Sequence, residues 1–165
     1  MNIRFSCALE KGGGQQFARL VLHIGGSALG DGWEVSGTIA LCLQTALARL
    51  ATLQHAPDTT PLADIPLADN QFAPYYDTPA AALPYGASTF DGEWLLLFKY
   101  RHCAGDLSRN RYAAVCQAYG QDAVLIADFP FQAYCGLLRQ LAGRLDAVQA
   151  PWGGRLLVYG RAKAA

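Results

Sequence analysis

The chain has 165 residues, enough for one domain whose hydrophobic core needs no metal or disulfide for stability. Its formal net charge is zero, so no overall field marks it as a nucleic-acid-binding protein. The five cysteines include no Cys-x-x-Cys pair, and no run approaches the roughly eighteen apolar residues of a membrane span. We therefore expect a single cytoplasmic domain over residues 1–165, with neither a disulfide framework nor a membrane partner.

The first third of the chain predicts a hairpin. Apolar and polar side chains alternate over 2–9 and, after three glycines, over 17–24, which indicates two antiparallel strands. The glycine-rich stretch 25–32 has the glycine spacing of a phosphate-binding loop, but it carries Asp31 where that loop needs a lysine, so we reject nucleotide binding. We expect Asp31 to accept hydrogen bonds from nearby backbone amides.

A helix is predicted next, over 38–54. Apolar residues recur there at spacings of three and four, the pattern of an amphipathic helix that packs on a core. Ser36 or Thr38 is the expected N-cap, and His55 would face the negative end of the helix dipole.

The range 54–89, which we name the acidic excursion, differs from the sequence on either side. It holds six of the eight prolines together with several aromatic residues, which predicts an irregular but ordered loop. No lysine or arginine occurs between Arg49 and Lys99, whereas six acidic residues do: Asp58, Asp64, Asp69, Asp77, Asp91 and Glu93.

We expect the acidic excursion to bind a basic partner, because a segment of one charge sign is typical of an interaction surface. Alternatively, its acids pair within the fold with the arginines of the last third of the chain. The residues predicted to contact a partner are Asp58, Asp64, Asp69, Phe72, Tyr75, Tyr76 and Asp77.

Strands dominate the chain after the excursion. The range 90–101 is apolar on both faces at its centre, which predicts a strand covered on both sides, and two further strands follow over 111–118 and 123–127. Asp128 and Pro130 are a favourable start for a second amphipathic helix.

A short strand over 155–159 completes the predicted order, which is ββα, the long loop, then βββαβ. This order predicts an α+β fold, with a largely antiparallel sheet and two amphipathic helices packed on it.

Few residues could form a catalytic centre. His102 and Cys103 are adjacent, but neighbours at the end of a strand point to opposite faces. Asp91 and Glu93 would share a strand face, yet no histidine or lysine beside them completes a mechanism. No group of histidine, cysteine and carboxylate residues has metal-ligand spacing, so we predict no catalytic residue, metal or cofactor.

Two short motifs and the element order resemble a known family. Gly30-Asp31 after the second strand, Phe90-Asp91-Gly92 before the hydrophobic strand, and a closing proline-bearing amphipathic helix resemble the bacterial polymorphic-toxin immunity proteins of immunity protein family 42. The resemblance implies that the protein binds and neutralises a cognate toxin domain of a contact-dependent inhibition system, without catalysis. Such toxins are often nucleases, whose basic surfaces an acidic aromatic surface would complement. Asp31 and Asp91 would then support turns.

Three functions are therefore compared with the structure. The first is toxin neutralisation through the acidic excursion, with a toxin domain as partner and no nucleic acid. The second is a small hydrolase or transferase that uses Asp91 and Glu93, or His102 and Cys103. The third is a structural subunit in which the excursion closes a homodimer.

Overall fold

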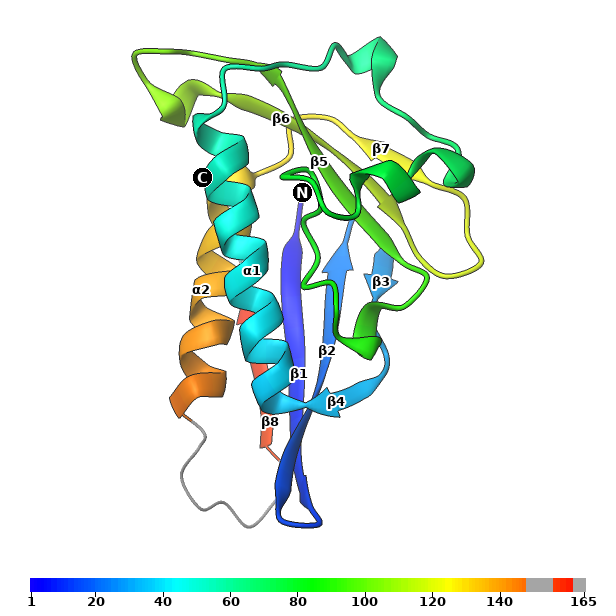
Figure 1. The fold of residues 1–165 in the computed structure, drawn as a ribbon, viewed down its shortest axis with the longest axis vertical. Helices are drawn as coiled ribbons and strands as arrows, with labels where there is room; N and C mark the ends of the chain where they lie inside the picture. Colours follow the sequence, from blue (N-terminus) through cyan, green and yellow to red (C-terminus); the bar gives the residue numbers. More distant parts are fainter. Residues whose placement is uncertain (148–155, 162–165) are drawn as a thin grey trace.

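The strands form two antiparallel sheets, where the sequence predicts one, and two long helices pack beside them (Figure 1). The computed structural model describes residues 1–147 and 156–161. The elements follow the predicted order, with two short additional strands before the first helix, and the α+β class of a single domain is confirmed. The first sheet comprises β1 (Ile3–Gly12), β2 (Gln15–Ile24), β3 (Ser27–Leu29), β4 (Trp33–Val35) and β8 (Leu156–Arg161).

The predicted hairpin is formed by β1 and β2, which pair from Ile3 with Ile24 to Gly12 with Gln15. Gly13 and Gly14 connect them with φ of 57° and 78°, which is the type I′ turn that only residues tolerant of positive φ adopt without strain. β8 pairs with the free edge of β1, and β3 and β4 share the opposite edge of β2. The first residue of the predicted last strand lies outside the described residues.

The first helix, α1 (Ser36–His55), begins two residues earlier than predicted. The expected N-cap is wrong: Val35 occupies the cap position, no side chain caps the helix, and Ser36 is its buried first residue. Helix α1 is long enough and apolar enough, with a mean hydropathy of 1.2, to cross a membrane. Core helices of soluble proteins meet the same two criteria, and seven residues of α1 are buried within the fold.

The second helix, α2 (Phe131–Ala147), packs beside α1, and both helices contact the first sheet (Figure 1). Asp128 is not its cap. Its backbone has a positive φ of 51°, and its carboxylate accepts a hydrogen bond from the Tyr100 hydroxyl, which raises the pKa of Tyr100.

The second sheet comprises β5 (Trp94–Arg101), β6 (Arg111–Gln117) and β7 (Val124–Ile126) in that order. Its two faces look into different hydrophobic clusters. Leu95 and Leu97 join the main core, whereas Leu96 and Phe98 join a second cluster that the acidic excursion completes. The prediction that this strand is covered on both sides is therefore confirmed, although it begins at Trp94 and not at residue 90.

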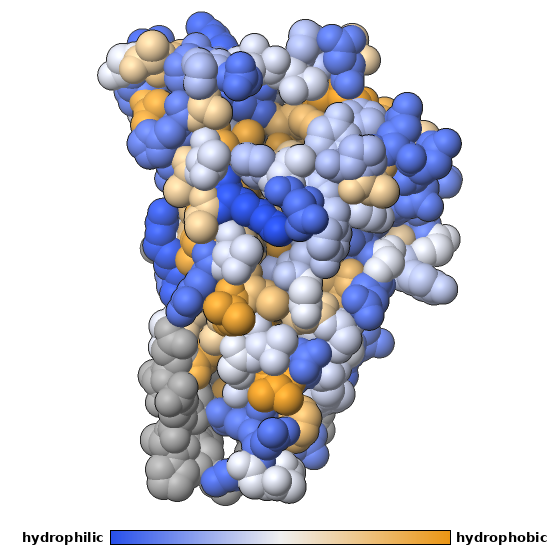
Figure 2. Space-filling view, viewed as in Figure 1, coloured by the Kyte–Doolittle hydropathy of each residue, from blue (hydrophilic) through white to orange (hydrophobic). Residues whose placement is uncertain are grey.

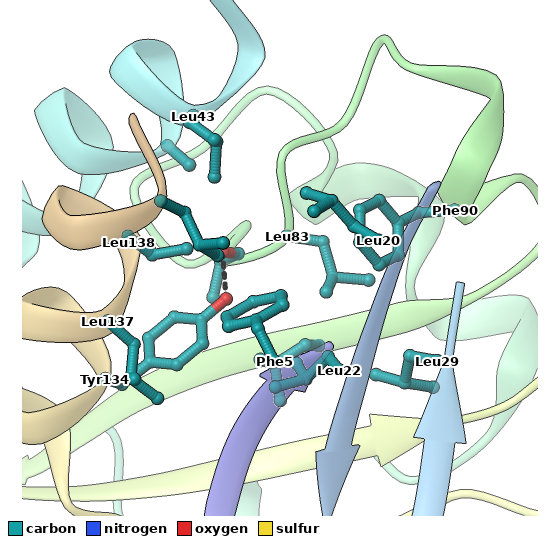
Figure 3. Close-up of a cluster of buried hydrophobic side chains, with 14 of the residues drawn as sticks. Phe5, Leu20, Leu22, Leu29, Leu43, Leu83, Phe90, Tyr134, Leu137 and Leu138 are labelled. Carbon is teal, nitrogen blue, oxygen red and sulfur yellow. Dashed lines mark hydrogen bonds between the residues drawn. The ribbon is translucent and has the colours of Figure 1, made fainter. Parts of the chain in front are cut away.

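The main core lies between the helices, the first sheet and the inner part of the acidic excursion (Figure 3). Phe5 and Tyr134 stack with ring centroids 6.2 Å apart, beside Leu83 from the excursion. The buried Tyr134 hydroxyl donates a hydrogen bond of 2.8 Å to the carbonyl of Ala82, so helix α2 holds the excursion from inside the core.

We predict that Tyr134→Phe lowers the free energy of unfolding by about 1–3 kcal/mol, because the buried Ala82 carbonyl loses its side-chain donor. Urea denaturation of both proteins measures the change. Tyr119→Phe is the matched control, since Tyr119 is 78% exposed, and it should leave the stability unaltered. Equal stability of the two variants would contradict the role assigned to the hydroxyl.

Candidate partner-binding surface

The acidic excursion is irregular, as predicted, and it consists of bends and short 3-10 turns. Proline excludes longer helices here because it lacks an amide donor and clashes with the preceding turn. Backbone hydrogen bonds between residues three apart stabilise the turns, for example from Asp64 to Pro61 at 2.9 Å and from Tyr75 to Phe72 at 2.9 Å. The turns are Leu62–Asp64, Asp69–Gln71, Ala73–Tyr75 and Ser88–Phe90.

Lys99 fixes the start of the excursion. Its side chain is buried (2% exposed), and its ammonium donates to the carbonyls of Gln54, at 3.1 Å, and Ala56 at the end of α1. Burial lowers the pKa of Lys99, and the nearby charge of Asp58 opposes that shift. The backbone amide of Thr60 also donates to the Lys99 carbonyl, at 2.8 Å. The buried Lys99 ammonium therefore stabilises the carbonyl groups at the C-terminal end of α1.

The middle of the excursion pairs with the edge of the second sheet. Ala81 forms an antiparallel bridge with Leu96. On either side of it the Ala82 amide donates to the Leu95 carbonyl and the Leu97 amide to the Ala80 carbonyl, both at 2.9 Å. The excursion thus covers the exposed edge of β5, which would otherwise present unpaired backbone groups.

The outer side of the excursion carries the predicted aspartates. Asp58, Asp64, Asp69 and Asp77 are all exposed. Asp77 makes an ion pair of 3.2 Å with Arg49, at the surface, and such exposed pairs contribute little stability. Among the described residues, no ion pair joins an excursion aspartate to an arginine of the last third of the chain, so the alternative of internal pairing is wrong for this part of the protein.

Two of the three predicted aromatic contacts change their role. Phe72 is fully buried, with its ring 5.8 Å from Trp94, so its prediction as a contact residue is wrong: it is a core residue that holds the excursion down. Tyr75 is half-buried and meets Phe98 edge-on at 5.2 Å. Tyr76 remains on the surface, 40% exposed. Figure 2 shows one face of the molecule, on which polar side chains separate small apolar groups.

The structure brings Tyr76 together with Tyr85 and Trp94, two aromatic residues that were not predicted as contact residues. The rings of Tyr76 and Tyr85 lie 5.2 Å apart, and Trp94 lies 6.4 Å from Tyr76 and 5.6 Å from Tyr85. These rings line a small surface cavity of about 70 Å³, which we name the aromatic hollow. Its lining is completed by Gly86, Ala87, Phe90, Asp91, Gly92 and Glu93. Tyr76 and Trp94 are eighteen residues apart in sequence, so no local pattern predicted that they lie close together. The acidic residues beside Trp94 were the one sequence signal that indicated a surface position.

The two family-like motifs pack against each other. A Cβ atom on Gly30 would lie 2.5 Å from the Leu20 carbonyl and 2.7 Å from the Phe90 ring, and the backbone φ there is 86°. Both the lack of space and the positive φ require glycine at this position. The Gly30 amide donates to the carboxylate of Glu93. The expected role of Asp31 is wrong: its carboxylate forms an ion pair of 2.8 Å with Arg19, and Glu93 accepts the backbone amide in its place.

The residues that could take part in catalysis are not arranged as a catalytic mechanism requires. Asp91 and Gly92 form a turn before β5. The prediction that Asp91 and Glu93 share a strand face is therefore wrong. The Cys103 thiol faces the Arg109 carbonyl at 3.6 Å, and no hydrogen bond joins it to His102 in the described residues. Likewise, the described residues contain no group of three or more metal-ligating side chains. The hydrolase hypothesis therefore receives no support from these contacts.

Neither a family model nor a curated protein nor a solved structure matches this chain. The resemblance to immunity proteins therefore stays a prediction from the sequence motifs.

We predict that Glu93→Gln gains stability relative to the wild type as pH rises above about 4.5. Burial raises the pKa of Glu93 above its ordinary value of 4.5, so between the two values the folded protein binds more protons and wild-type stability falls with rising pH. The variant keeps an oxygen acceptor for Gly30 but does not titrate.

Urea denaturation from pH 3.5 to about 7 measures this difference. Glu34→Gln is the matched control of opposite sign, because hydrogen bonds from the Val35 amide and Ser88 lower the pKa of Glu34. That variant should lose relative stability as pH rises. A Glu93→Gln difference that is independent of pH would contradict the assignment.

We also predict that Cys103 is the one thiol of the folded protein that reacts quickly with Ellman's reagent at about pH 8. Cys103 is half-exposed, whereas the other four cysteines are buried, and burial raises the pKa of Cys7, Cys116 and Cys135 to about 11. Cys103→Ser should remove the fast phase. A fast phase of more than one thiol would show that the core opens readily.

Proposed function

We propose that this protein is an immunity protein that binds and neutralises a cognate toxin domain through the outer side of the acidic excursion. The observation that carries the proposal is the surface itself: Asp58, Asp64, Asp69 and Asp77 are exposed on a segment whose inner side is fixed in the core. Because the segment is held by backbone pairing and buried side chains, binding would cost little ordering entropy.

The charge pattern favours a basic partner. Between Arg49 and Lys99 the sequence has no lysine or arginine, and Lys99 is buried against the end of α1, so no lysine or arginine of this segment offsets the aspartates at the surface. Nuclease toxins hold phosphate groups with basic side chains, and an acidic surface would accelerate encounter with such a domain and favour it over other partners.

The same pattern argues against the homodimer hypothesis. A two-fold symmetric dimer places the same surface patch of each subunit against its copy. Two copies of the acidic excursion would bring like charges together, which costs energy, whereas a basic toxin domain would neutralise them. Light scattering of the purified protein separates the two, and a dimer that dissociates on mutation of the excursion would favour the structural subunit.

The test of the function is protection of growing cells. The product of the gene immediately upstream is expressed alone and together with the full-length protein, and the purified pair is tested for a complex. Restored growth and a complex that weakens with salt are the expected results. Continued toxicity with a folded, co-expressed protein, and no complex at low salt, would overturn the proposal.

We predict that the double variant Asp64→Lys/Asp69→Lys weakens the complex by about tenfold or more and makes its affinity less dependent on salt. Neither carboxylate has a hydrogen bond or ion pair in the described residues, so the fold should tolerate both changes. Glu10→Lys, an exposed charge reversal on β1 near the hairpin turn, is the matched control. Unchanged affinity of the double variant would exclude these residues from the contact, and leave neutralisation by another surface.

A further inference from the structure

The aromatic hollow has the construction of a receptor for a positive charge. Tyr76, Tyr85 and Trp94 are inclined to one another at 46°, 52° and 82°, so the rings stand as walls and do not stack on each other's faces. The face of an aromatic ring carries partial negative charge and attracts an ammonium or guanidinium group that lies against it.

Carboxylates stand beside these rings. Asp91 is exposed in the lining, and Glu93 is half-buried there. No lysine, arginine or histidine lines the hollow. Arg19 is paired with Asp31 and Arg49 is paired with Asp77, so neither is an occupant of the hollow. The site thus combines aromatic faces with uncompensated negative charge.

The walls of the hollow are held in place before any ligand arrives. The Tyr85 hydroxyl accepts a hydrogen bond of 3.0 Å from the Leu95 amide, and the buried Phe72 ring lies behind Trp94 at 5.8 Å. Glu93 accepts the Gly30 amide, and Gly92, with φ of 73°, turns the chain beneath the exposed ring of Tyr119. Rigid aromatic groups of this kind are the usual anchor points of protein interfaces.

We infer that the aromatic hollow binds one lysine or arginine side chain of a basic protein partner, between the rings of Tyr76, Tyr85 and Trp94 and beside the Asp91 carboxylate. The volume of about 70 Å³ admits the charged end of one side chain and excludes a larger small-molecule ligand. The inference rests on the proposed function only for the identity of the protein that carries this cation.

The first experiment needs no toxin. The isotope-labelled full-length protein is titrated with the blocked amino acids N-acetyl-lysine methylamide, N-acetyl-arginine methylamide and N-acetyl-norleucine methylamide, and the Trp94 indole N–H signal is followed by NMR. We expect saturable shifts with lysine or arginine, but not with norleucine, which has a similar chain without the charge. The Trp33 indole signal should not move. Equal shifts with norleucine, or no shift with either cation, would overturn the inference.

Substitutions at Tyr76 separate a charge–aromatic contact from simple apolar burial. Tyr76→Phe keeps the aromatic face and should retain binding, whereas Tyr76→Leu keeps apolar bulk and should lose about two- to fivefold in affinity for the blocked cation. As a separate single variant, Asp91→Asn should also weaken binding of the blocked cation. Glu10→Gln, which lies away from the hollow, should not weaken it. Equal affinities of the Phe and Leu variants would contradict the role of the ring.

The toxin complex then tests where the cation comes from. If a complex forms, Tyr76→Leu should weaken it by about tenfold, because the contact is desolvated there, and Tyr76→Phe should not. If Tyr76→Leu leaves the affinity of the complex unchanged, the hollow is not a contact with the toxin, and the proposed function still stands. No complex, together with binding of the blocked cations, overturns the proposed function and leaves the hollow as a cation site.

Discussion

The pairing of Ala80–Ala82 with the edge of β5 is the interaction on which the arrangement of this protein depends. Two backbone hydrogen bonds of 2.9 Å join the acidic excursion to the second sheet, and the buried Tyr134 hydroxyl donates to the Ala82 carbonyl from α2. These contacts turn a proline-rich segment into a covering layer. Without them β5 would have an open edge, and the second hydrophobic cluster would lose one of its walls.

Fixing the inner side of the excursion determines what its outer side presents. Phe72 and Ile65 are buried against the second sheet, so the aspartates between and after them project to the surface. The side chain of Lys99 is directed inward to the carbonyls at the end of α1. The surface is therefore acidic because of how the segment is anchored as well as because of its composition, and the aromatic hollow forms where the excursion returns to β5.

The two long helices and the longer strands were predictable because each has a local signal, whereas the three-residue strands β3 and β4 were not predicted. Alternation over 2–9 and 17–24 defined the hairpin, and apolar spacing defined α1 and α2. The division into two sheets was not predictable, since strand order depends on contacts between distant residues. Phe72 was misassigned for a similar reason: an aromatic residue in a polar loop has the same local pattern whether it faces a partner or its own core.

The turn chemistry shows the same limit at shorter range. Asp31 follows Gly30 directly and was the obvious acceptor for nearby amides, yet Glu93, sixty-three residues away in sequence, accepts the Gly30 amide while Asp31 pairs with Arg19. Asp128 resembled a helix cap but takes a positive φ and binds Tyr100. In both cases a tertiary partner outcompeted the local hydrogen bond that sequence spacing favours.

Hydrogen exchange of the free protein and of its mixture with the proposed toxin partner tests the central claim most directly. The account predicts that the Ala82 and Leu97 amides exchange slowly already in the free protein, because they pair the excursion with β5. Added toxin should then protect the outer turns Leu62–Asp64 and Asp69–Gln71. Fast exchange of Ala82 and Leu97 in the free protein, or protection confined to the β1–β2 hairpin, would contradict the account.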